Sequence, residues 1–208
     1  ELFAPKLMTN PKKIVQLLHL VRAGLASGLL TKEDVVDWAC KIVAKDEKPD
    51  IFFIDLALSS SKSINTIIRY FSDYLNFESP IVQGRPLLAL LYRQFYSGQL
   101  TLEQTVRKLY HLKSEACFTG REERYIYSIN NDFDCANDNI YGTIEDVYAD
   151  VNKFLSFYKD YPLLNLYQCD VLDLNIGRNI DENINIQQEE CLVQAATESQ
   201  AKPWWKFW

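Results

Sequence analysis

The residue types that most often perform chemistry are few in this chain, and they are not grouped at catalytic spacing. The only histidines are His19 and His111, and neither belongs to a paired metal-binding helix motif. We interpret both as side chains that pack or are solvated on helices, not as bases or ligands. The chain also lacks a glycine-rich phosphate loop and a Gly-x-Ser-x-Gly elbow. We therefore expect no catalytic residues and no enzymatic activity.

The cysteines indicate a reducing environment. Their positions are Cys40, Cys117, Cys135, Cys169 and Cys191. The number is odd and no two lie at metal-ligand spacing, which argues against a disulfide scaffold or a zinc ribbon. We expect free and mostly buried thiols, and a cytoplasmic protein.

The segment 130–139 is rich in Asp and Asn and has some likeness to a calcium loop. Counted from Asp134, Glu145 falls at the twelfth position, where such a loop has its bidentate glutamate. However, Ala136 stands where a ligand belongs, and Asn139 stands where the sharp turn requires Gly. We favour a polar loop between helices, with side chains bonded to the local backbone, over a metal site. We expect neither a metal nor a cofactor.

Negative charge is concentrated in one part of the chain. Between residues 115 and 160 there are ten acidic and four basic side chains, a net charge of −6 that equals the net charge of the whole chain. This is either a solvated face that aids solubility or a docking surface for a basic partner. The candidate partner-binding residues are Asp132, Asp134, Asp138, Glu145, Asp146 and Asp150. An acidic chain without a basic stripe argues against direct binding of nucleic acid.

The last residues form an aromatic tail that carries Lys202 and Lys206. Its candidate anchor residues are Trp204, Trp205, Phe207 and Trp208. Exposed Trp and Phe are unfavourable in water, so the tail either packs back on the fold or anchors in a partner protein. A lipid contact ranks last because two charges on a short segment give a weak anchor. The apolar runs of the chain are also too short to span a bilayer.

An internal repeat indicates the architecture. Ser27 to Asp34 recurs as Ser97 to Gln104, and residues 17–33 share eight identities in seventeen positions with residues 87–103. In each copy an apolar-periodic helix ends, a Gly permits a left-handed exit, and a Thr caps the next helix. Asp34 and Gln104 stand three residues after the capping Thr, where the reciprocal partner of a capping box belongs. The repeat therefore predicts a helix–turn–helix hairpin that is used twice.

The remaining apolar periodicity is also helical. The expected helices run from about residue 10 to the first turn and over about 31–45, 50–58, 63–77, 86–113 with its turn, 119–129 and 143–158. The segment 50–58 could be a buried strand, but we favour a short helix because no partner strand is evident. We expect 175–185 to be a loop, and a last short helix over about 187–199. The stretch 163–176 is undecided.

These elements predict an all-α fold of antiparallel helix hairpins, stacked as a bundle or as a short solenoid-like domain. We expect a helical domain over 1–160, with the repeat at 17–43 and 87–113, and a C-terminal extension with the aromatic tail over 161–208. The chain begins at Glu1 and not at Met, so a preceding segment is allowed.

Three segments carry a resemblance to a known group. These are residues 28–39, 54–65 and 140–147, each a helix start followed by apolar spacing. They resemble the small helical bacterial immunity proteins of polymorphic or contact-delivered toxin systems, and the likeness covers roughly residues 14 to 160. The resemblance implies a cytoplasmic, non-catalytic protein that binds and neutralises a cognate toxin. A basic nuclease would suit the acidic surface. The alternative is a helical adaptor or scaffold that recruits a partner through its aromatic tail.

Overall fold

The structure is a computed structural model that describes residues 15–75, 82–161 and 173–182. Every regular element in these ranges is a helix, so the predicted all-α fold is confirmed. The chain divides into two units, Glu1–Tyr167 and Gln168–Trp208. The helices of the first unit are α1 (Val15–Ala26), α2 (Lys32–Val43), α3 (Ile51–Ala57), α4 (Ile64–Tyr74), α5 (Arg85–Tyr96), α6 (Leu102–Glu115), α7 (Gly120–Asn137) and α8 (Ile144–Ser156). The second unit contains a helix over 173–182.

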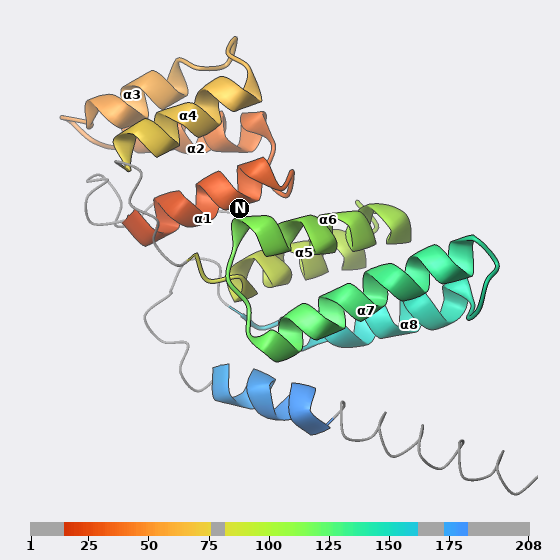
Figure 1. The fold of residues 1–208 in the computed structure, drawn as a ribbon. Helices are drawn as coiled ribbons and strands as arrows, with labels where there is room; N and C mark the ends of the chain where they lie inside the picture. The colour runs from red at the N-terminus through yellow and green to blue at the C-terminus, as the bar shows by residue number, and fades with distance from the viewer. Residues whose placement is uncertain (1–14, 76–81, 162–172, 183–208) are drawn as a thin grey trace, which may run out of the picture. The chain divides into compact units, whose positions relative to one another are not determined.

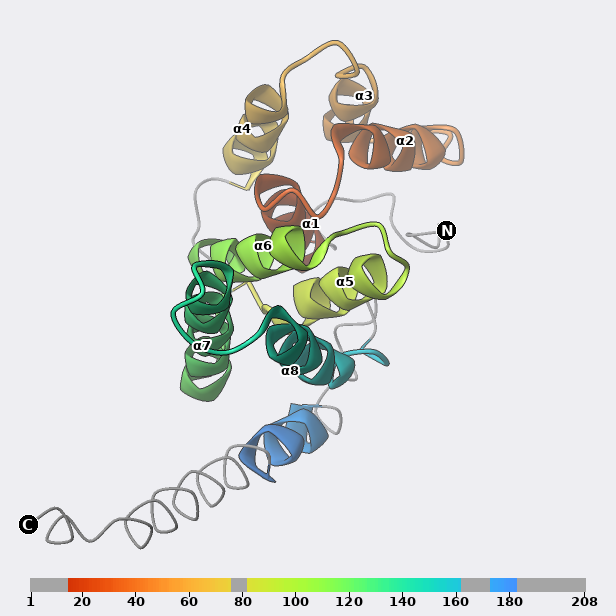
Figure 2. The ribbon, with the colours of Figure 1, turned by 90° about the vertical axis from the view of Figure 1, so that its right-hand side faces the viewer.

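Within the first unit, α1 lies between two groups of helices (Figures 1 and 2). It packs on α4 and also on α5 and α6. On the α4 side, α3 packs on both α2 and α4. Aromatic contacts hold this group together: the ring centroids of Trp38 and Phe53 are 5.6 Å apart, and those of Phe52 and Phe71 are 5.4 Å apart.

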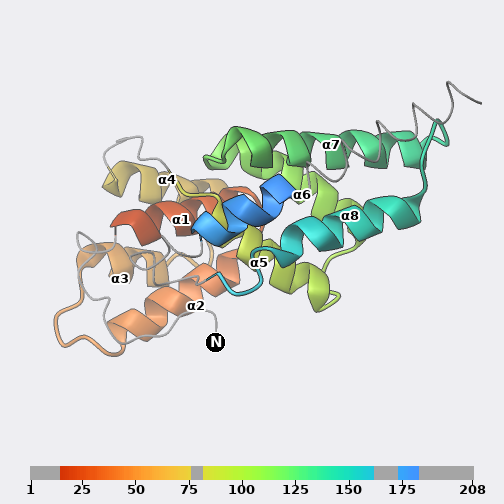
Figure 3. The same cartoon turned by 90° about the horizontal axis from the view of Figure 1, so that it is seen from below.

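The helices α5 to α8 form a closed ring of four, in which each packs on the next and α8 returns to α5. Figure 3 shows α7 and α8 side by side. The ring encloses buried side chains from all four helices. They include Leu88, Leu91, Val106, Leu109, Ile126, Ile129, Val151 and Phe154. This half of the unit is therefore a bundle with its own core.

The two copies of the repeat have the same local structure. Gly28 and Gly98 have φ values of 69° and 73°, the left-handed conformation that favours glycine. Thr31 with Asp34, and Thr101 with Gln104, each form the predicted reciprocal capping box.

The packing of the two copies differs. In the second copy α5 packs on α6, whereas in the first copy α2 makes its main contacts with α3, and α1 makes its main contacts with α4. The prediction of two equivalent hairpins is therefore right for the turns but wrong for the packing of the first pair.

The first turn is also linked to the helices of the second copy by polar contacts. The Gln94 side chain donates from Nε2 to the Leu29 carbonyl over 2.8 Å, and Lys108 Nζ donates to the Gly28 carbonyl. Burial lowers the pKa of Lys108.

The segment 50–58 is a helix, as predicted. Asp50 caps α3 by accepting a hydrogen bond from the Phe52 backbone N–H, and Phe52, Phe53 and Leu56 are buried. Aromatic residues with this spacing gain more free energy by packing as a helix on α2 and α4 than they would in an isolated strand.

Two segments predicted to be loops are helical. The segment 130–139 is largely the last part of α7, because Phe133 and Ala136 continue the buried stripe of Ile129 and Tyr125. Its polar side chains bond mainly to other side chains and not to the backbone: Asn130 donates to Asp134 one turn on, and Asp132 accepts from Ser128 one turn before it. The predicted loop 175–185 begins as part of the helix over 173–182, in which Ile176 and Ile180 are buried one turn apart.

Two further expectations are wrong for residues that the structure describes. The apolar spacing of Val106, Leu109 and Tyr110 predicts an inner face for all three, but Tyr110 is 42% exposed. The thiols were expected to be mostly buried, but Cys40 and Cys117 are exposed and Cys135 is half-buried. The other two cysteines, the predicted helix start near residue 10 and the predicted helix over 187–199 lie outside the described residues.

Candidate functional site

The acidic stretch between residues 115 and 160 is partly neutralised by arginines from earlier helices. The pairs are Arg22 with Glu115 at 3.8 Å, Arg85 with Glu122 at 2.8 Å and Arg107 with Asp134 at 2.6 Å. These partners lie far away in the sequence, so a charge count over one segment overstates the negative charge of the folded surface.

Glu122 is the most enclosed of these acids, with an exposed fraction of 1%. Its Oε1 accepts hydrogen bonds from Arg85 Nε at 2.8 Å and from the Tyr158 hydroxyl at 2.9 Å. Its Oε2 accepts from the backbone N–H and the hydroxyl of Thr119, both at 2.8 Å. Burial, and then the charge of Glu122, raise the pKa of Tyr158 well above its usual range. This saturated network joins α5, α7 and Tyr158, which follows α8, and we assign it a structural role.

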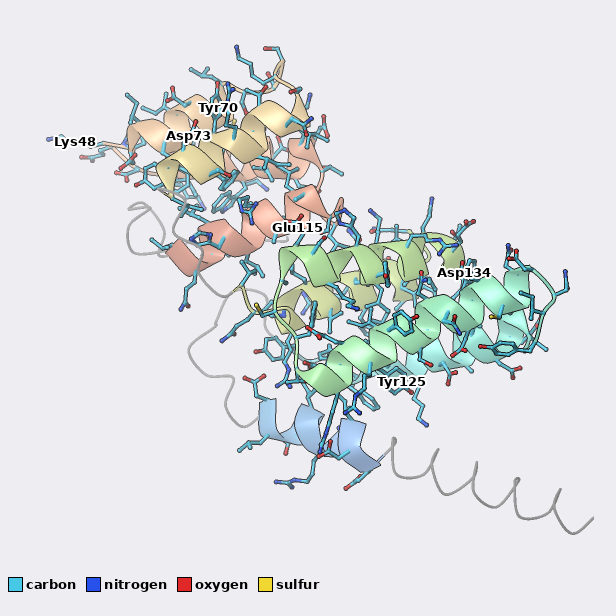
Figure 4. All side chains as sticks on the ribbon, in the orientation of Figure 1. Lys48, Tyr70, Asp73, Glu115, Tyr125 and Asp134 are labelled. Carbon is cyan, nitrogen blue, oxygen red and sulfur yellow. The ribbon has the colours of Figure 1, made fainter. Side chains whose placement is uncertain are left out.

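Asp134 lies apart from the other predicted binding residues. It is on the flank of α7 toward α6 (Figure 4), where it accepts a hydrogen bond from Arg107 NH2. The same guanidinium donates to the Asn130 side chain at 2.9 Å and lies 5.2 Å from the centre of the Phe133 ring. The hydrogen bond from Arg107 lowers the pKa of Asp134. Asp134 thus links α7 to α6 through Arg107, and we exclude it from the proposed binding surface.

The other predicted residues lie near the turn between α7 and α8. We call this set the acidic tip: Asp132, Asp138, Glu145, Asp146 and Asp150. Burial, followed by the charge of Asp132, raises the pKa of Asp150; Lys153 opposes this effect, and Asp146 adds to it. Carboxylates from both helices of the hairpin therefore repel one another across it.

The turn itself is held against α7 by Tyr141. Its hydroxyl donates to Asp132 at 3.2 Å and accepts from the Asn131 side chain at 2.8 Å. Its contact with the Cys135 thiol, together with burial and Asp132, raises the pKa of Tyr141 to about 12. Asn139, with φ 55°, and Gly142, with φ 74°, form the left-handed positions of the turn. Asp146 stabilises the start of α8 by accepting from the Thr143 hydroxyl at 2.7 Å.

Exposed aromatic and aliphatic side chains, none of them among the predicted site residues, border the acidic tip. Those on the turn and on α8 are Ile140, Tyr141, Ile144 and Tyr148. On α5, Tyr96 is 75% exposed. A signal was present in the sequence, because Tyr148 falls outside the apolar stripe that predicts the buried face of its helix. Its ring contacts only the edge of the core at Phe95, with the centroids 5.3 Å apart, and leaves much of its surface exposed.

Among residues 15–75, 82–161 and 173–182, no group of three or more His, Cys, Asp or Glu side chains is placed to hold a metal ion. In the same ranges no helix is both long and apolar enough to cross a membrane. The predicted tail anchors, Trp204, Trp205, Phe207 and Trp208, lie outside the described residues. The acidic tip and its aromatic border therefore form the candidate site.

No protein-family model, curated protein sequence or solved structure matches this chain.

Proposed function

We propose that this protein is a non-catalytic binding protein that recognises a basic partner protein through the acidic tip. In the specific form that we favour, it is an immunity protein, and the partner is a cognate bacterial toxin such as a basic nuclease. One observation carries the proposal: the charges of the acidic tip are concentrated and mutually repulsive, whereas Glu115, Glu122 and Asp134 in the same stretch are paired with arginines.

The two groups of acids differ in how stable their charged forms are in the folded protein. Raised pKa values show that a carboxyl group is less stable as an anion in the folded protein than in water. Asp150 is such a group, and Asp132 and Asp146 contribute to the effect. Sequences often retain locally unfavourable groups where function requires them. A cationic partner would relieve this repulsion on binding.

The same chemistry suggests how a toxin would be neutralised. A nuclease presents Lys and Arg where it binds phosphates, and a surface of carboxylates can occupy that region in place of the nucleic acid. The rigid bundle formed by α5 to α8 would hold the acidic tip in place without a change of fold. Association would be fast, because opposite charges steer the two proteins together.

The test is neutralisation of the protein encoded by the adjacent gene. We expect the two proteins to copurify, and we expect the chain to suppress the toxicity of its neighbour at equimolar ratio. The double variant Asp138→Lys and Glu145→Lys, both at exposed sites of the acidic tip, should lose protection. The matched control is Asp55→Lys with Asp73→Lys, both exposed on α3 and α4, which should protect fully (Figure 4 shows Asp73).

Two outcomes would contradict the proposal. The first is a neighbouring toxin that stays fully active with an equimolar amount of the wild-type protein. The second is equal protection by the tip variant and the wild type. Deletion of residues 202–208 distinguishes the two hypotheses. The adaptor hypothesis predicts that the deletion abolishes partner binding, whereas the present proposal predicts that partner binding persists.

A further inference from the structure

We propose that three tyrosines beside the acidic tip form an anchor for arginine side chains of the basic partner. We call Tyr92, Tyr96 and Tyr148 the tyrosine surface. The inference rests on the proposed function and deepens it, since it assigns the chemistry that holds the partner after the carboxylates have attracted it.

The tyrosine surface is exposed yet well supported. Tyr96 is 75% exposed and stacks on Tyr92, with ring centroids 5.6 Å apart and an interplanar angle of 24°. Tyr148 of α8 is 53% exposed, and its ring lies 5.3 Å from that of the buried Phe95 of α5. The helices α5 and α8 pack on each other. Large rings on a packed helix pair lose little conformational entropy on binding, which is typical of anchor residues.

The chemistry of the surroundings favours a cation. Glu145 lies three residues before Tyr148 on α8, so the two exposed side chains are neighbours on the helix surface. A carboxylate beside an aromatic face matches arginine in particular. The guanidinium can lie flat on the ring while its edge donates to the carboxylate, whereas a lysine ammonium is compact and more strongly hydrated.

The protein itself contains an example of this arrangement. Arg107 lies over the Phe133 ring at 5.2 Å and donates to the neighbouring Asp134 at 2.6 Å. Within the described ranges, the cations that lie over aromatic rings are Arg107 and Lys113, and neither lies over Tyr96 or Tyr148. The tyrosine surface therefore provides an arginine of another molecule with the same combination of aromatic ring and carboxylate that Arg107 contacts between α6 and α7.

Charge selects this occupant over a second copy of the chain. A symmetric dimer through the tyrosine surface would bring two acidic tips close to each other, and like charges close together oppose association. A neutral apolar segment would leave the adjacent Glu145 without a partner. A basic segment satisfies both the rings and the carboxylates.

The experiment uses the full chain and two helical peptides that are identical except for arginine or lysine at every fourth position. Dissociation constants are measured by calorimetry, and shifts of the tyrosine ring protons are measured by NMR. We expect the arginine peptide to bind about two- to fivefold more tightly than the lysine peptide, the range for an exposed cation–π contact.

The preference should disappear in the double variant Tyr96→Ser and Tyr148→Ser, and it should persist when the same residues are changed to Phe, which keeps the rings. The matched control is Tyr110→Ser with Tyr127→Ser, two exposed tyrosines of α6 and α7. All four sites are exposed, so we expect stability to change by no more than about 0.5 kcal/mol.

Three results would overturn the anchor: equal affinity for the two peptides, a preference that survives the loss of both rings, or no binding of either peptide. The two proposals fail separately. If the adjacent toxin is neutralised but the arginine preference is absent, the anchor is wrong and the immunity function stands. If the tyrosine-dependent preference is present but no toxin is neutralised, the function is wrong and the anchor stands.

Discussion

Glu122 shows how much a single residue can hold together in this fold. It is an ionisable group enclosed by Arg85, Tyr158 and Thr119, and both of its oxygens accept two hydrogen bonds. Such a network is stable when complete and unstable when one member is missing.

We therefore predict that Glu122→Gln lowers the free energy of unfolding by about 3 kcal/mol, because it removes the charge of the buried carboxylate that accepts from Arg85 Nε. Urea denaturation at neutral pH measures the change. The control is Glu123→Gln at the next, exposed position, for which we expect a change within about 0.5 kcal/mol. Equal effects of the two variants would refute the assigned role of Glu122.

The opposite behaviour is expected at Asp150, where burial and neighbouring carboxylates raise the pKa. A carboxyl group whose pKa is higher in the folded than in the unfolded state favours folding when it is protonated. That contribution is lost as the pH rises through the folded-state pKa. Asp150→Asn should therefore stabilise the protein at pH 7 by roughly 0.5 kcal/mol, a value reduced to allow for solvent screening.

The pH dependence distinguishes this effect from a general gain in packing. In acid, below the ordinary pKa of an aspartate, both states of the wild type are protonated at this position and the advantage of Asp150→Asn should vanish. Thermal unfolding at the two pH values measures the difference. A gain of the same size at both pH values would show that charge is not its cause.

At the scale of the element, the two turns of the repeat provide a matched pair. Gly28 and Gly98 both have positive φ, so alanine at either position is strained. We predict that Gly98→Ala lowers the free energy of unfolding by roughly 1 kcal/mol, since the new methyl group meets open space and only the backbone is strained.

We predict that Gly28→Ala lowers the free energy of unfolding by more than Gly98→Ala does. The added Cβ would lie 2.8 Å from Lys108 Nζ, which must then move away from the Gly28 carbonyl. Chemical denaturation of both variants, with Ala26→Gly as a control for the helix end, measures the pair. If Gly98→Ala is the more harmful of the two, the contact between Lys108 and the first turn does not contribute as proposed.

The elements that could be predicted from the sequence are those set by local chemistry. The capping boxes at Thr31 and Thr101 depend on residues three positions apart, and both are present. The end of α7 was misjudged because Asp and Asn are common in loops, yet Phe133 is buried and extends the helix. Local propensity could not reveal this, since burial is decided by other helices.

The candidate site was only partly predictable for the same reason. Acidic residues could be counted, but the loss of Asp134 to Arg107 depends on the packing of α6 against α7. The exposure of Tyr96 likewise depends on where α5 ends relative to its neighbours. The charged half of the surface could therefore be predicted from the sequence, whereas its aromatic half could not.

At the scale of the whole molecule, the chain has a net charge of −6, and its acidic tip is concentrated on one hairpin. Rim charges act mainly on association, whereas anchors act on dissociation. For the complex with the adjacent gene product, we predict that Asp138→Lys with Glu145→Lys lowers the association rate constant at least about tenfold in low salt.

The same variant should make that rate less sensitive to ionic strength, because fewer steering charges remain. Surface plasmon resonance over a series of salt concentrations measures both effects. Loss of the two exposed tyrosines of the anchor should instead raise the dissociation rate constant and leave the salt dependence unchanged. A wild-type association rate that is independent of salt would refute electrostatic steering.

The raised pKa of Asp150 has a consequence for the binding of a partner. If a partner brings positive charge to the acidic tip, the affinity of Asp150 for its proton must fall, and the complex must release hydrogen ions into the buffer. The heat of binding measured in mildly acidic solution would then differ between buffers with different ionisation enthalpies, and affinity would weaken as the solution is acidified. Complex formation would thus be coupled to the acidity of the compartment in which the two proteins meet.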